Sequence, residues 1–113
     1  HISGIDSPDK LVGDLSGGQK QAVAIARAVY FKRRVLLLDE PTSALSVRET
    51  EALLGQVLKL KSENVSSVLV THNIYHAYQV CDRFVIMSHG TKVFDVAKAD
   101  TDIAQLTEYV VLT

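Results

Sequence analysis

The sequence predicts an α/β protein with a mostly parallel sheet and a C-terminal antiparallel hairpin. The apolar runs at residues 35–38 and 67–71 do not alternate with polar residues, which is typical of parallel strands buried on both faces. Segments with helical periodicity lie between such runs, as right-handed crossovers require. Residues 83–87 and 92–96 flank a turn with Gly90, so we expect this hairpin to form an antiparallel edge of the sheet.

Capping patterns locate the two longer helices. Turn-forming residues fill positions 1–15, and the capping box at residues 16–19 then predicts a helix that ends near residue 30. A second capping box at residues 46–49 predicts an amphipathic helix that reaches about residue 62.

Two shorter helices are expected towards the C-terminus. Asn73 is a suitable N-cap for a helix over residues 74–80. Thr101 or Asp100 is the expected N-cap of a last helix that ends near Val110.

Length and composition exclude several classes of protein. The chain has 113 residues, about one small domain, and its net charge is 12 − 13 = −1. That balance excludes a strong nucleic-acid binder, which needs clustered Lys and Arg. The single cysteine, Cys81, excludes an internal disulfide and fits a reducing cytosol. No apolar run approaches the roughly 20 residues of a membrane-spanning helix, and no secretory leader is visible.

Ser16, Gly17, Gly18 and Gln19 form the first candidate site, at the start of the first predicted helix. Glycines let a phosphate approach the backbone closely, and the free N–H groups of a helix start favour an anion. The alternative is an ordinary helix start, at which Ser16 acts only as a cap.

Asp39 and Glu40 form the second candidate site, at the end of the first predicted strand. Ligands of open α/β sheets sit at the carboxyl ends of strands. Asp39 can hold a hydrated Mg²⁺, and Glu40 can accept a proton from an attacking water. The alternative is a pair of solvated carboxylates. His72, which follows the second strand, can donate to a phosphate oxygen or simply pack in a loop.

The spacing of these signals resembles that of the ATP-binding cassette (ABC) ATPases, and the resemblance covers nearly the whole chain. Residues 15–19 resemble the family's signature motif, residues 35–40 its Walker B strand, and residues 43–46 its D-loop. His72 resembles the switch histidine of the H-loop.

The resemblance implies a P-loop ATPase core and a shared catalytic site. Family members pair head to tail, so Ser16–Gln19 and Ser46 would contact ATP bound mainly by a second ATPase subunit, either identical or homologous. Asp39 would bind Mg²⁺, Glu40 would polarise the hydrolytic water, and His72 would contact the γ-phosphate, which suits phosphoryl transfer. Membrane permease subunits would be the other partners, with no nucleic acid. The protein would then be peripheral, at the cytoplasmic face of the cell membrane.

Two departures from the family pattern affect this interpretation. Ser46 stands where the D-loop usually ends in Asp, and no lysine follows a glycine, as a Walker A loop requires. We therefore expect the C-terminal part of one nucleotide-binding domain, without the half that carries Walker A and the Q-loop. Residues 1–30 would end the helical subdomain, and residues 31–113 would form the core. Alone, the chain is expected to be inactive and to leave part of the Leu37 strand uncovered.

Softer similarities indicate the branch of the family. The Ser-Pro-Asp at residues 7–9 and the segment 71–78 resemble ATPase subunits of simple-sugar importers. One alternative is a non-transport ABC ATPase of chromosome maintenance or translation. Another is a non-catalytic module that binds a nucleotide or a partner, if the chain is complete. The DNA that precedes His1 would test this last alternative. If it encodes a Walker A loop in frame with His1, the chain is part of an enzyme and not a stand-alone module.

Overall fold

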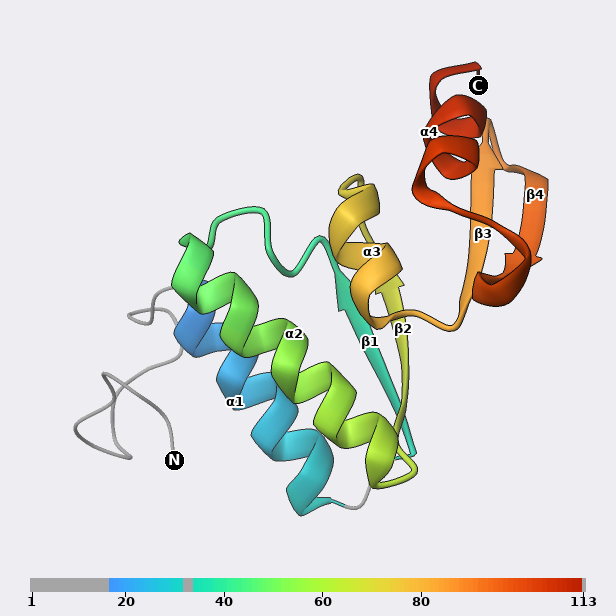
Figure 1. The fold of residues 1–113 in the computed structure, drawn as a ribbon. Helices are drawn as coiled ribbons and strands as arrows, with labels where there is room; N and C mark the ends of the chain where they lie inside the picture. Colours follow the sequence, from blue (N-terminus) through green and yellow to red (C-terminus); the bar gives the residue numbers. More distant parts are fainter. Residues whose placement is uncertain (1–16, 32–33, 113) are drawn as a thin grey trace. The chain divides into compact units, whose positions relative to one another are not determined.

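The protein is described by a computed structural model that covers residues 17–31 and 34–112. These residues belong to two compact units, His1–Val70 and Thr71–Thr113 (Figure 1). Every helix among the described residues falls short of the length and apolarity that a membrane-spanning segment needs.

The first unit contains two helices and two parallel strands. The elements follow in the order α1 (Gly17–Tyr30), β1 (Val35–Asp39), α2 (Val47–Ser62) and β2 (Ser66–Val70). β1 and β2 pair in parallel, from Val35 opposite Ser66 to Asp39 opposite Val70. The predicted ends of both helices are confirmed, and so is the α/β class. Ser16, the predicted cap of α1, lies outside the described residues.

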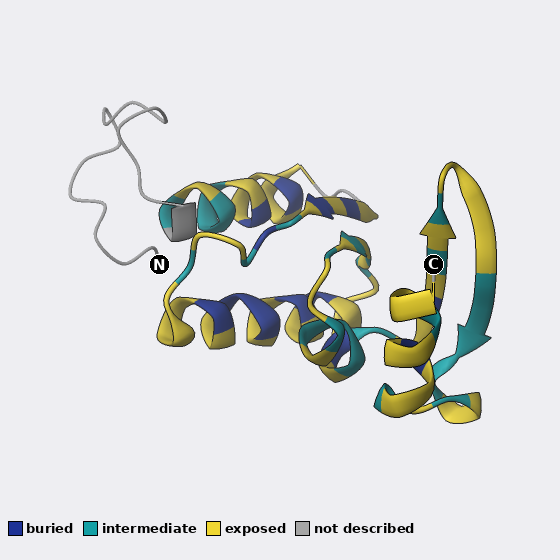
Figure 2. Ribbon diagram, turned by 90° about the horizontal axis from the view of Figure 1, so that it is seen from above, coloured by how far each residue is buried: buried dark blue, intermediate teal, exposed yellow. Residues whose placement is uncertain are grey.

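The apolar core of this unit lies between the helices and one face of the strand pair. α1 and α2 contact each other, α1 contacts β1, and α2 contacts β2. Buried positions run along one side of α2 (Figure 2). The buried apolar residues of the unit are Ile25, Ala28, Leu36, Leu38, Leu53, Leu54, Val57 and Leu60.

Within the described residues, β1 and β2 are buried on one face only, which differs from the expected burial on both faces. Leu38 is 3% exposed, whereas its neighbour Leu37 is 73% exposed. Successive side chains of a strand point to opposite faces, and both helices of this unit cover the same one. β2 likewise alternates between half-buried and exposed residues. The sequence predicts that part of the Leu37 strand is uncovered. Within the described residues, this part is the face of β1 that carries Leu37.

The second unit contains a hairpin and short helices: α3 (Ile74–Val80), β3 (Arg83–Ser88), β4 (Thr91–Ala97), the 3-10 turn η2 (Lys98–Asp100) and α4 (Ile103–Leu112). The central turn residues His89 and Gly90 have φ of 51° and 78°, as a two-residue hairpin turn requires. Within the described ranges, β3 and β4 form a sheet of their own rather than an edge of the β1–β2 sheet, which corrects the prediction. The tight turn makes their pairing local, so it needs no other strand.

The cap of the last helix also differs from the prediction. Asp102, rather than Thr101 or Asp100, accepts the N–H of Gln105 through Oδ1 at 2.8 Å. Residues 98–100 form the 3-10 turn instead, so the helix begins later, at Ile103. The cap must directly precede the helix that it serves.

Aromatic rings on one face of the hairpin pack against the two helices, because the register places Phe84 and Phe94 on the same face. Tyr78 of α3 stacks on Phe84 of β3 with centroids 5.8 Å apart, and the ammonium of Lys98 lies 4.7 Å from the Tyr78 centroid. Phe94 of β4 stacks on Tyr109 of α4 at 4.0 Å. Stacked aromatic rings stabilise a fold beyond the effect of the apolar area that they bury. These two pairs therefore hold α3 and α4 against the hairpin.

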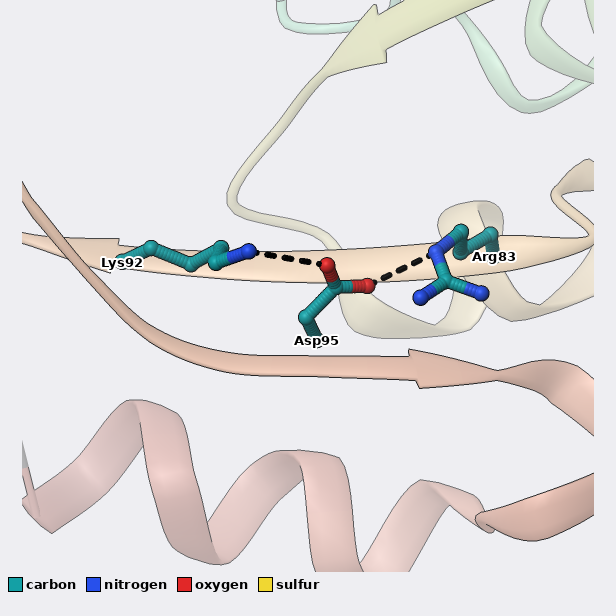
Figure 3. Close-up of polar contacts among 3 residues, drawn as sticks. All are labelled: Arg83, Lys92 and Asp95. Carbon is teal, nitrogen blue, oxygen red and sulfur yellow. Dashed lines mark hydrogen bonds and ion pairs between the residues drawn. The ribbon is translucent and has the colours of Figure 1, made fainter.

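An acidic residue on the hairpin holds two basic side chains. Asp95 Oδ1 lies 2.7 Å from Arg83 Nε, and Asp95 Oδ2 lies 3.1 Å from Lys92 Nζ (Figure 3). The hydrogen bond from Lys92 and then the ion pair with Arg83 hold the pKa of the Asp95 carboxyl below its usual value. The ionised form is therefore stabilised by the native fold.

Replacing Asp95 by Asn is expected to lower the free energy of unfolding at pH 7 and to flatten its dependence on acidity. A carboxyl whose pKa is lower in the native state stabilises it above the unfolded pKa. This contribution disappears as the pH falls through the native pKa. Urea unfolding between about pH 7 and about pH 2 measures both effects, with the exposed Asp100→Asn variant as control. Identical pH profiles for the two variants would show that the ion pairs do not stabilise the fold.

Candidate functional site

The carboxyl ends of the two parallel strands carry the first part of the candidate site. Asp39 ends β1 opposite Val70, which ends β2. The N–H of Glu40 donates to the carbonyl of Val70 at 2.7 Å, so the chain stays paired one residue beyond β1. Asp39 is exposed, and Glu40 is half-buried with its Oε1 atom shielded from solvent. The two adjacent carboxylates thus lie where α/β sheets bind their ligands.

Glu40 has an unusual backbone conformation. Its φ is 47°, in the left-handed region, which costs an L-residue other than glycine about 1–2 kcal/mol. The residue before a proline is also biased towards extended conformations, and Pro41 follows here. Surrounding contacts must therefore hold Glu40 in this conformation.

A turn after β1 supplies these contacts. The carbonyl of Glu40 accepts the N–H of Ser43 at 3.3 Å and the hydroxyl of Ser43 at 3.1 Å. Pro41 is buried at the second position of this turn, where its fixed φ is favourable. Glu40 is thus held through its N–H on one side and its carbonyl on the other.

Ser46 links this turn to α2 as a capping box. Its Oγ accepts the N–H of Glu49 at 3.1 Å, while Glu49 Oε1 accepts the N–H of Ser46 at 3.2 Å. The capping box predicted for residues 46–49 is confirmed. In this conformation the Ser46 hydroxyl serves the helix start, a role that an Asp at the same position would also perform.

The start of α1 is the second part of the candidate site. α1 is 14 residues long and begins at Gly17, followed by Gly18 and Gln19, with no acidic residue in its first turn. The positive end of the helix dipole therefore meets no side-chain carboxylate of its own turn, which suits an anionic ligand such as a nucleotide phosphate.

The donors at the strand end also fit a magnesium ion. Mg²⁺ keeps several of its waters and is usually bound through one or two carboxylates together with substrate phosphates. Asp39 provides one exposed carboxylate at the end of β1. Among the described residues, no group of three or more His, Cys, Asp and Glu gathers to form a complete protein cage. One exposed carboxylate is compatible with a hydrated ion that also binds a phosphate ligand.

His72 belongs to the second unit. It is exposed and lies between Thr71 and Asn73. Thr71 Oγ1 accepts the N–H of Asn73 at 3.0 Å, and Asn73 Oδ1 accepts the N–H of His76 at 3.0 Å. The predicted N-cap of α3 is confirmed, and these bonds hold the main chain on the C-terminal side of His72. Asp39, Glu40 and the turn to Ser46 thus lie together in the first unit. His72 lies in the second unit.

The sequence-based predictions do not include the contact between Ser43 and Glu40. The pattern that could have predicted it is a proline at the second position of a turn after a strand, as in Glu40-Pro41-Thr42-Ser43. This pattern predicts a turn that closes between Glu40 and Ser43. It does not reveal the left-handed φ of Glu40, because that depends on the pairing with Val70.

Comparisons with known proteins identify similar sequences. The family model described as "ABC transporter" matches residues 2–43. The chain is 44% identical over 97 residues to the xylose/arabinose import ATP-binding protein XylG of Sulfolobus acidocaldarius, covering 86% of this chain and 39% of that protein. It is 37% identical over 105 residues to the ribose import ATP-binding protein RbsA of Bacillus licheniformis, covering 93% of this chain and 21% of that protein. The chain thus spans well under half of these relatives.

Solved structures with the same fold are ATP-binding cassettes. The post-hydrolysis dimer of the cassette MJ0796 with ADP and Pi aligns with a TM-score of 0.65 and 33% identity, covering 76% of this chain and 37% of that chain. The cassette MJ1267 aligns with a TM-score of 0.72 and covers 88% of this chain and 39% of that chain, at 23% identity. The second likeness concerns the fold alone.

Proposed function

Because the chain belongs to the ATP-binding cassette family of ATPases, we propose that its protein binds and hydrolyses ATP to drive the import of a solute, a simple sugar, across the cytoplasmic membrane. The observation that carries this proposal is the Asp39–Glu40 pair at the carboxyl end of β1, beside the end of β2. Adjacent carboxylates at that place suit a metal-assisted hydrolysis, and the relatives named above are import ATP-binding proteins.

Each candidate residue has a role that suits phosphoryl transfer. Asp39 would hold a hydrated Mg²⁺, and this ion would supply neutralisation of the phosphate charge. Glu40 accepts the proton of the attacking water. His72 contacts the γ-phosphate and orients the nucleophile. The protein's contribution to such a reaction is mainly positioning and charge stabilisation.

The remaining residues act on the nucleotide of a partner. In a head-to-tail dimer, Ser16, Gly17, Gly18 and Gln19 contact ATP that is bound mainly by a second ATPase subunit, and Ser46 contributes from the D-loop. The dimeric state of the cassette MJ0796 supports this arrangement. The glycines at the start of α1 allow close approach of a phosphate.

The proposed domain arrangement assigns residues 1–30 to the end of the helical subdomain. Residues 31–113 form the core, with the Walker B strand, the D-loop and the H-loop. The partners are permease subunits in the membrane, on whose cytoplasmic side the protein is peripheral. The net charge of −1 supports docking on protein rather than on nucleic acid. The names of the relatives, for xylose, arabinose and ribose, support a sugar as the solute.

Isolation of the protein from membranes tests the proposal. Expressed from its complete gene with an affinity tag, the protein is expected to co-purify with an integral membrane permease and to release phosphate from ATP. Cells without the gene are expected to lose uptake of radiolabelled xylose, arabinose or ribose, and to keep uptake of a labelled amino acid. Specific crosslinking to DNA or ribosomes, without a permease, would place the protein in the non-transport branch instead.

A further inference from the structure

The turn after β1 gives Ser43 a role that rests on the proposed role of Glu40. The carbonyl of Glu40 accepts two hydrogen bonds from Ser43, one from its N–H at 3.3 Å and one from its Oγ at 3.1 Å. Any residue other than proline keeps the first bond. The second needs a side-chain donor, here the hydroxyl of Ser43.

This second bond acts on a residue whose conformation is disfavoured. Glu40 has φ of 47° and precedes Pro41, so its relaxed state is extended. A change of the Glu40 backbone from the left-handed to the extended region changes the direction of its Cα–Cβ bond. The carboxylate then lies in another position. A general base must lie within hydrogen-bond reach of the proton that it accepts. The contacts that hold φ therefore also determine whether Glu40 reaches its water.

The other contact of this backbone lies on the opposite side. The N–H of Glu40 donates to Val70 on β2 at 2.7 Å, which places the peptide before Glu40. The peptide after Glu40 is held by the turn and by Ser43. We propose that Ser43 is a positioning residue for ATP hydrolysis, whose hydroxyl holds the Glu40 carbonyl and thereby aims the Glu40 carboxylate.

Three variants of the protein expressed from its complete gene test this role. Ser43→Ala removes the hydroxyl, and Ser43→Thr keeps one. Ser62→Ala is the matched control, because Ser62 Oγ donates to the carbonyl of Lys59 at 2.6 Å, also three residues earlier and on an exposed side chain. The readouts are kcat and KM for ATP at saturating Mg²⁺, and the midpoint of urea unfolding.

Ser43→Ala is expected to lower kcat about three- to tenfold, as the loss of one ordinary hydrogen bond allows. Its KM for ATP should stay within about twofold, because the bond acts on the hydrolytic base and not on nucleotide binding. Ser43→Thr is expected to restore most of kcat. Ser62→Ala is expected to keep the parental kcat, even where its unfolding midpoint falls as far as that of Ser43→Ala.

Several results would overturn the inference. Equal kcat for Ser43→Ala and Ser62→Ala, no recovery in Ser43→Thr, or a rise in KM alone would each exclude a positioning role. Glu40→Gln, measured in parallel, separates this failure from that of the proposed function. If Glu40→Gln abolishes turnover and Ser43→Ala does not lower it, only the role of Ser43 is wrong. If Glu40→Gln keeps the parental rate, the assignment of Glu40 as base is wrong, and Ser43 has no base to position.

Discussion

Replacing Glu40 by Gln is expected to lower the kcat of ATP hydrolysis by at least about 100-fold, since a positioned general base contributes roughly 10²–10⁴-fold. The amide has the shape of the carboxylate but cannot accept a proton at neutral pH. Binding of ATP should change little, so the variant should accumulate as an ATP-bound dimer. Phosphate release and size-exclusion chromatography with ATP measure the two effects in the protein expressed from its complete gene.

The matched control for this variant is Glu63→Gln. Glu63 is an exposed carboxylate at the C-terminal end of α2, in the same unit but at the other end of the helix from the turn. It is expected to keep the parental kcat. Hydrolysis by Glu40→Gln at the rate of Glu63→Gln would show that Glu40 is not the base, however well its position at the end of β1 suits that role.

Replacing Leu54 by Ala is expected to lower the free energy of unfolding by about 2–5 kcal/mol. Leu54 lies on α2 with an exposed fraction of 0%, among the buried residues between the helices and the strand pair. Truncation removes its buried methyl groups and leaves a cavity that a close-packed interior fills only partly. Equilibrium unfolding in urea measures the change.

Leu58→Ala provides the comparison on the same helix. Leu58 is 38% exposed, so its truncation leaves a space that water can enter and should cost less than about 1 kcal/mol. Equal losses for Leu54→Ala and Leu58→Ala would contradict the packing described for this core. A loss of kcat beyond the loss of folded protein would show that α2 also influences the site.

Local signals predicted most of the secondary structure. The capping box of Ser46 and Glu49 is present with both reciprocal bonds, and Asn73 caps α3 as expected. The turn at His89 and Gly90 joins the predicted hairpin. These features depend on residues no more than about four positions apart, so the sequence carries their full pattern.

Features that depend on distant parts of the chain were predicted less well. A continuous apolar run such as that of β1 does not reveal how many of its faces are covered, since Leu36 and Leu37 are equally apolar. Whether a hairpin joins a larger sheet is likewise absent from its own residues. Asp102 became the cap because the 3-10 turn precedes it, and the N–H of Lys98 in that turn donates to the carbonyl of the distant Asp82 at 2.9 Å.

The sequence by itself determined the order of the α-helices and strands, and it placed Asp39 and Glu40 at the end of a strand, because periodicity and capping act over short distances. Only the tertiary structure decided that, among the described residues, one face of β1 is uncovered, since that depends on which side both helices pack. Only the tertiary structure also decided the left-handed conformation of Glu40. That conformation is held between a bond to Val70 on another strand and the turn that Ser43 closes.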